Sequence, residues 1–118
     1  MVKINSENYV ENGFTADESL EVCAMLEKSG VDAIEMSGGT IYASGNYLYM
    51  RKGVVKSPEG ESYYRKATAR YKQRIGIPLL LVGGIRSMGG AGSILRDGIA
   101  DFISMCRLLI CKPNLLGR

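Results

Sequence analysis

The run Ile77-Pro78-Leu79-Leu80-Leu81-Val82 places the tightest limit on the fold of this chain. It is almost entirely apolar, it stops at Gly83-Gly84, and it lacks the alternation of apolar and polar residues found in a strand with one wet face. Such a pattern is typical of a parallel strand buried on both faces. Because parallel strands need crossover connections, which are usually helices, the rest of the chain should alternate between strands and helices.

Stretches with helical patterns lie between the β-rich runs. Thr15 and Glu18 have capping-box spacing, and Gly30 suits the end of the same helix. Pro58 suits the first turn of a second helix, and Gly98 suits the end of a third. The expected elements are strands over 2–5, 31–37, 77–82 and 100–105 and helices over 16–29, about 57–75, 87–96 and from Pro113 onward.

This order of strands and helices specifies a parallel sheet with right-handed crossovers. A half barrel and a small open α/β sheet both fit it. A complete (β/α)8 barrel usually needs about 250 residues, whereas the chain has 118 residues, which is room for roughly four strand-helix units. We therefore expect residues 1–118 to form a single partial domain, too short to be a complete barrel enzyme.

Charge and composition argue against several classes of function. The net charge is +3, and basic residues are mixed with acidic ones, so neither nucleic acid nor an anionic membrane is an expected partner. No apolar run reaches the roughly 18 residues that span a bilayer, and the polar N-terminus lacks the apolar part of a signal peptide, which predicts a cytoplasmic protein. Three cysteines without a CxxC pair or any histidine disfavour a disulfide framework, a metal site and His-dependent catalysis.

Ligands of parallel α/β folds bind beyond the C-terminal ends of the strands. Four segments fall there, namely residues 3–5, 37–39, 83–87 and 104–107. Many barrels hold a phosphate between the last two strand ends, using backbone N–H groups and a helix N-terminus. Gly83 and Gly84 would let the backbone approach an anion, and Arg107 would add a bidentate charged contact. The alternative is that the glycines form only a tight turn and that Arg107 is a surface residue.

Other candidate residues have equally plain structural interpretations. Lys3 could stabilise a negatively charged ligand, but a lysine near a chain end is more often simply exposed. Cys106 could be a reactive thiol, although a small buried apolar residue is its commoner role. Packing is the expected role of the helix-spaced Tyr64 and Tyr71. The tyrosines that could stack on a planar ligand are Tyr42, Tyr47, Tyr49, Tyr63, Tyr64 and Tyr71.

Taken together, four of these segments resemble the old yellow enzyme family of NAD(P)H:flavin oxidoreductases, in particular its bacterial NADH oxidase and 2,4-dienoyl-CoA reductase-like branch. The segments are residues 2–7, 30–39, 77–87 and 100–107, and they run almost from one end of the chain to the other. The resemblance implies the C-terminal half of a (β/α)8 TIM barrel, with about four parallel strands alternating with helices. It also implies FMN as the cofactor.

The same resemblance implies roles for five residues. Lys3 falls where the family places a basic residue against the N1/O2 edge of the flavin, a contact that raises the reduction potential. Gly83 and Gly84 match the loop that wraps the FMN phosphate. Cys106 and Arg107 match the Gly-Arg or Ser-Arg pair that completes the phosphate site, although cysteine at position 106 departs from the commoner glycine.

The remaining active-site residues of the family fall outside this sequence. Its His/Asn pair and its proton-donating Tyr belong to strands upstream of Met1, so no catalytic residue is assigned, and the cysteine spacing does not fit the iron-sulfur cluster of the reductase branch. The resemblance implies a fragment that is inactive alone, from a parent that passes hydride from NAD(P)H to FMN and on to an activated alkene. The open edges of a half barrel predict a homo-oligomer.

Two other functions fit the same residues. The first is a half barrel of another phosphate-binding enzyme, such as an aldolase or a synthase, because the glycine-loop geometry is shared widely. The second is a scaffold or interaction module that binds no ligand.

Overall fold

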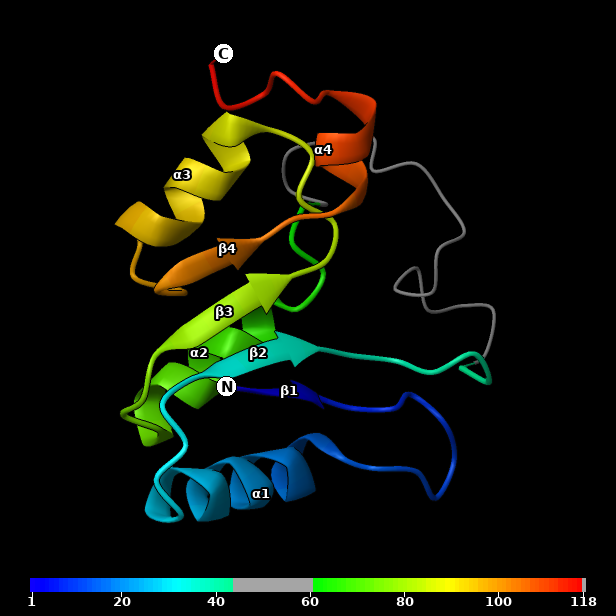
Figure 1. Ribbon diagram of the computed structural model, residues 1–118. Helices are drawn as coiled ribbons and strands as arrows, with labels where there is room; N and C mark the ends of the chain where they lie inside the picture. The colour runs from blue at the N-terminus through cyan, green and yellow to red at the C-terminus, as the bar shows by residue number, and fades with distance from the viewer. Residues whose placement is uncertain (44–60, 118) are drawn as a thin grey trace.

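The computed structural model describes residues 1–43 and 61–117 (Figure 1). Within these ranges four short strands alternate with four helices. In chain order the elements are β1 (Val2–Asn5), α1 (Ala16–Lys28), β2 (Ile34–Ser37), α2 (Arg65–Arg74), β3 (Leu79–Val82), α3 (Met88–Arg96), β4 (Phe102–Ser104) and α4 (Arg107–Cys111). The alternation of strands and helices predicted from the sequence is confirmed.

The four strands form one parallel sheet in the order β1-β2-β3-β4 (Figure 1). Their register places Lys3, Glu35, Leu80 and Phe102 next to one another, and we call these four residues the cross-sheet row. Every strand lies beside the strand that follows it in the chain. Because all the strands are parallel, their C-terminal ends meet at the same edge of the sheet.

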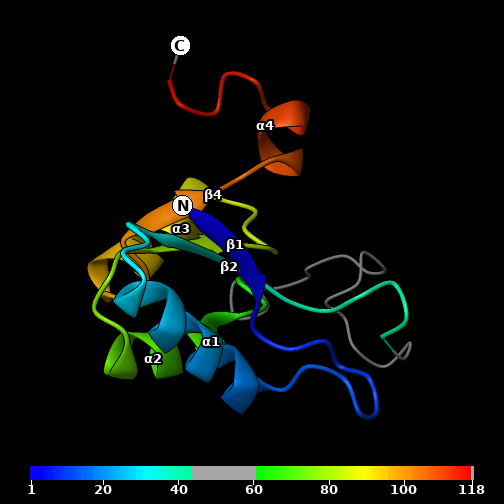
Figure 2. The same cartoon turned by 60° about the horizontal axis from the view of Figure 1, so that its bottom comes forward.

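The core lies between the sheet and the helices that pack on one of its faces. Helices α1 and α2 pack on Ile34, Met36 and Leu79, and α3 packs on Leu81. Figure 2 shows α1 and α2 together on one side of the sheet. Since side chains of a strand alternate between its two faces, the cross-sheet row lies on the opposite face.

The capping residues of α1 and the glycine that closes α3 lie where the sequence predicts them. The hydroxyl of Thr15 accepts a hydrogen bond of 3.3 Å from the amide of Glu18, and the Glu18 carboxylate accepts one of 2.8 Å from the amide of Thr15. At the other end of α1, Gly30 has a φ of 82° and its amide donates to a carbonyl of the last turn. Gly98 closes α3 in the same way, with a φ of 66°. Left-handed residues at these positions are typical of Schellman caps.

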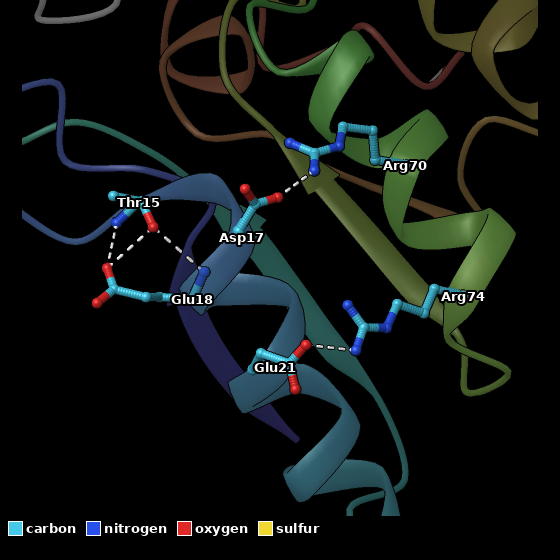
Figure 3. Close-up of polar contacts among 6 residues, drawn as sticks. All are labelled: Thr15, Asp17, Glu18, Glu21, Arg70 and Arg74. Carbon is cyan, nitrogen blue, oxygen red and sulfur yellow. Dashed lines mark hydrogen bonds and ion pairs between the residues drawn. The ribbon is translucent and has the colours of Figure 1, made fainter.

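Two ion pairs join the exposed sides of α1 and α2 (Figure 3). Asp17 accepts from Arg70, and Glu21 accepts from Arg74 at 2.5 Å. Both acidic residues and both arginines are spaced four apart, so the two bridges are separated by one helical turn. Because the side chains are about half exposed or more, each pair contributes at most about 1 kcal/mol to stability.

The strands are shorter than predicted. β2 begins at Ile34 because the amide of Val31 bonds to the carbonyl of Leu26 and so completes the cap of α1. β3 begins at Leu79, after Pro78, which has no N–H for the ladder. β4 is likewise confined to residues 102–104 rather than 100–105.

Two predicted helices differ from the structure. The expected start of the second helix at 57–60 lies outside the described residues, and α2 itself begins at Arg65, after a turn at residues 63–64. The prediction of a helix from Pro113 onward was wrong, because α4 ends at Cys111 and residues 113–116 form turns. The amide of Leu115 bonds to the carbonyl of Lys112 and the amide of Gly117 to that of Asn114, three residues back in each case, so this segment forms separate turns instead of a helix.

Candidate anion-binding site

A small open pocket lies at the C-terminal ends of β3 and β4. Its volume is about 70 Å³, and residues 83–86 and 104–108 line it. The two strands are neighbours in the sheet, so the segments that follow them lie side by side. Gly83, Gly84, Cys106 and Arg107, which are four of the five residues singled out from the sequence, are therefore brought together.

Two arginines are the charged residues of this pocket. Arg86 and Arg107 line it, and its described lining contains no aspartate or glutamate. A guanidinium group stays protonated at any physiological pH and donates paired hydrogen bonds to planar or tetrahedral oxyanions. The side chains of the pocket are therefore suited to a phosphate or a carboxylate. The sequence-based assignment named Arg107 and gave Arg86 no role of its own.

Both glycines of the loop have backbone conformations that other residues rarely adopt. The φ angle is 101° at Gly83 and 73° at Gly84. A Cβ atom at Gly83 would lie 2.8 Å from the ring of Tyr64, and one at Gly84 would lie 2.8 Å from the ring of Tyr63. The glycine pair is thus required by the turn and by the two tyrosine rings, whether or not a ligand binds.

Glu61 contacts the same loop and was missed as a site residue from the sequence. Its carboxylate accepts hydrogen bonds from the amide of Arg86 and the hydroxyl of Ser87, both at 3.1 Å. The two partners are 25 and 26 residues away in the chain. No local sequence pattern around Glu61 predicts a contact with residues so far away in the chain.

Lys3 is not part of the lining of the pocket. It lies on β1, and β2 separates it from β3. Its ammonium group is 2.5 Å from Oε1 of Glu35, whose side chain is only 12% exposed. Pairing with a nearby carboxylate lowers the net positive charge that Lys3 presents to a ligand. Lys3 therefore lies on the open face of the sheet, apart from the four pocket residues.

The turn after β2 has a structural role in the described residues. Gly39 has a φ of 76°, and its carbonyl accepts a hydrogen bond from Asn5. Gly38 is buried, and its carbonyl accepts a hydrogen bond of 2.7 Å from the hydroxyl of Tyr64. Neither glycine lines the pocket.

The tyrosines divide between packing and exposure. Tyr64 and Tyr71 are buried, which confirms the packing role expected of them. Tyr63 is partly buried beside Tyr64, and Tyr42 is exposed. Tyr47 and Tyr49 lie outside the described residues.

The cysteines differ in accessibility. Cys23 is completely buried in the core, and burial raises the pKa of its thiol. Cys106 and Cys111 are exposed, so the expected burial of Cys106 was wrong. The reason is its position at the start of α4, on the rim of the pocket rather than under a helix.

In residues 1–43 and 61–117 there is no cluster of three or more His, Cys, Asp or Glu side chains able to hold a metal ion. In the same residues no helix has the length and apolar character needed to cross a membrane.

Comparisons with known proteins identify relatives, although no protein-family model matches the chain. The chain is 32% identical over 113 residues to an NADH oxidase of Thermoanaerobacter brockii and 30% identical over 115 residues to a metal reductase of Desulforamulus reducens. It is 28% identical over 116 residues to an NADH-dependent flavin oxidoreductase of Aspergillus parasiticus. These matches cover 95%, 98% and 97% of this chain.

The relatives are much longer than the chain. It spans 16% of the NADH oxidase, 16% of the metal reductase and 25% of the flavin oxidoreductase. Their names are those of oxidoreductases, and the Aspergillus protein is named as NADH-dependent and flavin-dependent, so the chain is similar to enzymes of this class. These matches are consistent with a fragment of a member of the old yellow enzyme family.

Proposed function

We propose that this chain is the C-terminal half of an FMN-dependent (β/α)8-barrel oxidoreductase and that it carries the phosphate end of the FMN site. The observation that carries the proposal is the pocket at the ends of β3 and β4, which combines Gly83 and Gly84 with Arg107. Its position agrees with the rule that barrels bind phosphate between the loops after their last two strands.

The residues present fit the phosphate of FMN. Arg86 and Arg107 would hold a dianion by paired hydrogen bonds, without an opposing carboxylate in the described lining of the pocket. Gly83 and Gly84, both with positive φ, form the turn that brings the segment after β3 to the pocket. When bound, FMN would supply the hydride chemistry, and the residues of this chain would bind and orient it.

Lys3 would act at the other end of the cofactor. Its place on the open face of the sheet agrees with a role beside the N1/O2 edge of the flavin, where a cation favours the reduced ring. The carboxylate of Glu35, at 2.5 Å, would fix the position of the ammonium group and moderate its charge. Lys3 would thus contact the flavin ring, whereas the pocket residues would contact the phosphate.

The arrangement of the sheet supports a half barrel over an open α/β sheet. Doubly wound sheets reverse their strand order at one point and carry helices on both faces. Here the order is sequential, and α1, α2 and α3 pack on the same face. A barrel has this arrangement, with its helices outside and its ligand at the C-terminal ends of the strands.

The activity that we propose belongs to the parent enzyme. It would pass hydride from NADH or NADPH to FMN and then to an activated alkene or a similar acceptor, in the cytoplasm. The chain contains no histidine, so it does not supply the His/Asn pair expected of the family. We therefore propose that the chain alone binds FMN weakly and does not turn over.

Binding of FMN to the purified chain tests the phosphate assignment. Fluorescence titrations would compare FMN, riboflavin, which lacks the phosphate, and inorganic phosphate as a competitor. We expect FMN to bind at least about tenfold more tightly than riboflavin, because hydrogen bonds to charged groups contribute about 1.5–3 kcal/mol. Arg107→Ala should abolish this preference, whereas Arg96→Ala, which removes an exposed arginine of α3, should leave it unchanged.

Other outcomes of the titration would support different functions. If FMN bound no more tightly than inorganic phosphate, the flavin ring would contribute nothing to affinity, and a different phosphate-binding barrel enzyme would be favoured. If neither bound, the chain would be better described as a scaffold or interaction module.

We further propose that a second copy of the chain covers the open face of the sheet. In the described residues β1 and β4 each have one unpaired edge, and Phe102 of the cross-sheet row is 56% exposed. Pairing β4 of one copy with β1 of its partner on both sides would give eight parallel strands and leave no open edge.

Light scattering after size exclusion would measure the oligomeric state. We expect a dimer that Phe102→Asp dissociates, whereas Met25→Asp, at an exposed position of α1, should leave it intact. A monomeric wild-type chain would contradict the proposal that a second copy covers the sheet.

A further inference from the structure

The glycine loop is held from its outer side by a carboxylate. Oε2 of Glu61 accepts a hydrogen bond of 3.1 Å from the amide of Arg86, and Oε1 accepts one of 3.1 Å from the hydroxyl of Ser87. The same hydroxyl accepts a bond of 3.0 Å from the amide of Gly90 and so caps α3. Glu61 is therefore linked to both the loop and the first turn of the helix.

The residues that follow Glu61 contact the other end of the loop. The ring of Tyr63 lies against Gly84 and the ring of Tyr64 against Gly83, where a Cβ atom would be within 3 Å of either ring. Tyr64 is 4% exposed and also bonds to the carbonyl of Gly38. Residues 61–64 thus contact the loop at both of its ends.

We propose that Glu61 is a positioning residue for the anion pocket and acts on a bound phosphate through the loop that it holds. The proposal rests on the proposed FMN phosphate site. Glu61 itself does not line the pocket. Its contact fixes the backbone of Arg86, a residue that does line the pocket.

The charge at the N-terminus of α3 agrees with a role for Glu61 in holding the loop and a role for the pocket residues in binding the phosphate. The N-terminus of α3 carries partial positive charge, and the Glu61 carboxylate is hydrogen-bonded at the cap of that helix. An internal anion already satisfies this end of the helix, so a ligand phosphate is directed to the pocket between the two loops.

Two different substitutions remove the same contact. Glu61→Ala deletes the carboxylate. Gly90→Ala keeps it but builds a Cβ atom 2.2 Å from Oε2, so the flexible end of Glu61 must move away. Gly89→Ala is a matched control, because a Cβ at that neighbouring helix position meets nothing within 4 Å. Glu61→Gln is the conservative variant, since its amide oxygen still accepts a hydrogen bond.

FMN and riboflavin affinities would be measured for each variant. We expect Glu61→Ala and Gly90→Ala each to weaken FMN binding by about tenfold and to leave riboflavin affinity within about twofold, since the loop acts on the phosphate. Gly89→Ala should leave both affinities unchanged, and Glu61→Gln should retain most of the FMN affinity. A general loss of structure would instead lower both affinities together.

Amide hydrogen exchange gives a second measurement that needs no flavin. The amide of Arg86 should exchange faster by about tenfold in Glu61→Ala and in Gly90→Ala than in Gly89→Ala, because its acceptor is lost. Unchanged exchange, or unchanged FMN affinity in both variants, would overturn the role of Glu61. If wild-type protein failed to prefer FMN over riboflavin while the exchange behaved as expected, the proposed function would fail and the contact would stand.

Discussion

The hydroxyl of Tyr64 donates a hydrogen bond of 2.7 Å to the carbonyl oxygen of Gly38, across 26 residues of the chain. The bond connects the turn after β2 to the residue that precedes α2. Both residues are buried, so the carbonyl would have no access to bulk water if the phenol were removed. An unsatisfied buried acceptor costs about 1–3 kcal/mol.

Tyr64→Phe should therefore destabilise the protein while keeping the ring against Gly83. We expect the free energy of unfolding to fall by about 1–3 kcal/mol in urea titrations. Tyr42→Phe, at a position that is 81% exposed, serves as the control and should change it by less than about 0.5 kcal/mol. Equal effects of the two substitutions would contradict the importance of this bond.

Gly83→Ala should destabilise the protein through strain in the loop. The substitution places a Cβ at a φ of 101° and 2.8 Å from the ring of Tyr64, which is buried and has little freedom to move. Strained backbone of this kind costs about 1–3 kcal/mol. Thermal unfolding would measure the loss, and Gly89→Ala should instead stabilise α3. A stable Gly83→Ala protein would show that the loop can repack.

The order of elements could be predicted from the sequence because its signals are local. The capping box of Thr15 and Glu18 and the apolar run before Gly83 each depend on neighbouring residues. Strand ends were less accurate, since Val31 is used by the cap of α1 instead of the ladder.

The candidate site could be predicted only where strand topology determined it. Gly83 and Arg107 follow neighbouring strands, and the rule for parallel sheets was enough to place both beside one pocket. Glu61 and the pairing of Lys3 with Glu35 depend on side-chain contacts between distant residues. Such contacts leave no periodic pattern in the sequence, and the structure was needed to find them.

Thiol reactivity should separate the cysteines by burial. Cys106 and Cys111 are exposed, whereas Cys23 is buried and the raised pKa of its thiol leaves little reactive thiolate. We expect a disulfide reagent at pH 8 to modify two thiols quickly and the third only after unfolding. Cys106→Ser and Cys111→Ser should each remove one fast equivalent, whereas loss of a fast equivalent in Cys23→Ser would contradict the assignment.

Asp101 should make stability depend on acidity. A hydrogen bond from Lys72, followed by one from the amide of Leu79, holds the pKa of this carboxyl below its ordinary value. A carboxyl whose pKa is lower in the folded than in the unfolded chain stabilises the fold above its unfolded pKa, about 3.9. That stabilisation is lost as the pH falls through the folded pKa.

Urea titrations between pH 6 and pH 2.5 would measure this dependence. Wild-type protein should lose stability on acidification more steeply than Asp101→Asn, because the variant has no proton to gain at this site. The difference should be below about 1 kcal/mol, since the side chain of Asp101 is 37% exposed and solvent screens the ion pair. Asp32→Asn, at another exposed carboxylate, is the control and should follow the wild-type slope. Parallel curves for wild type and Asp101→Asn would mean that Lys72 and Leu79 do not stabilise the charged form.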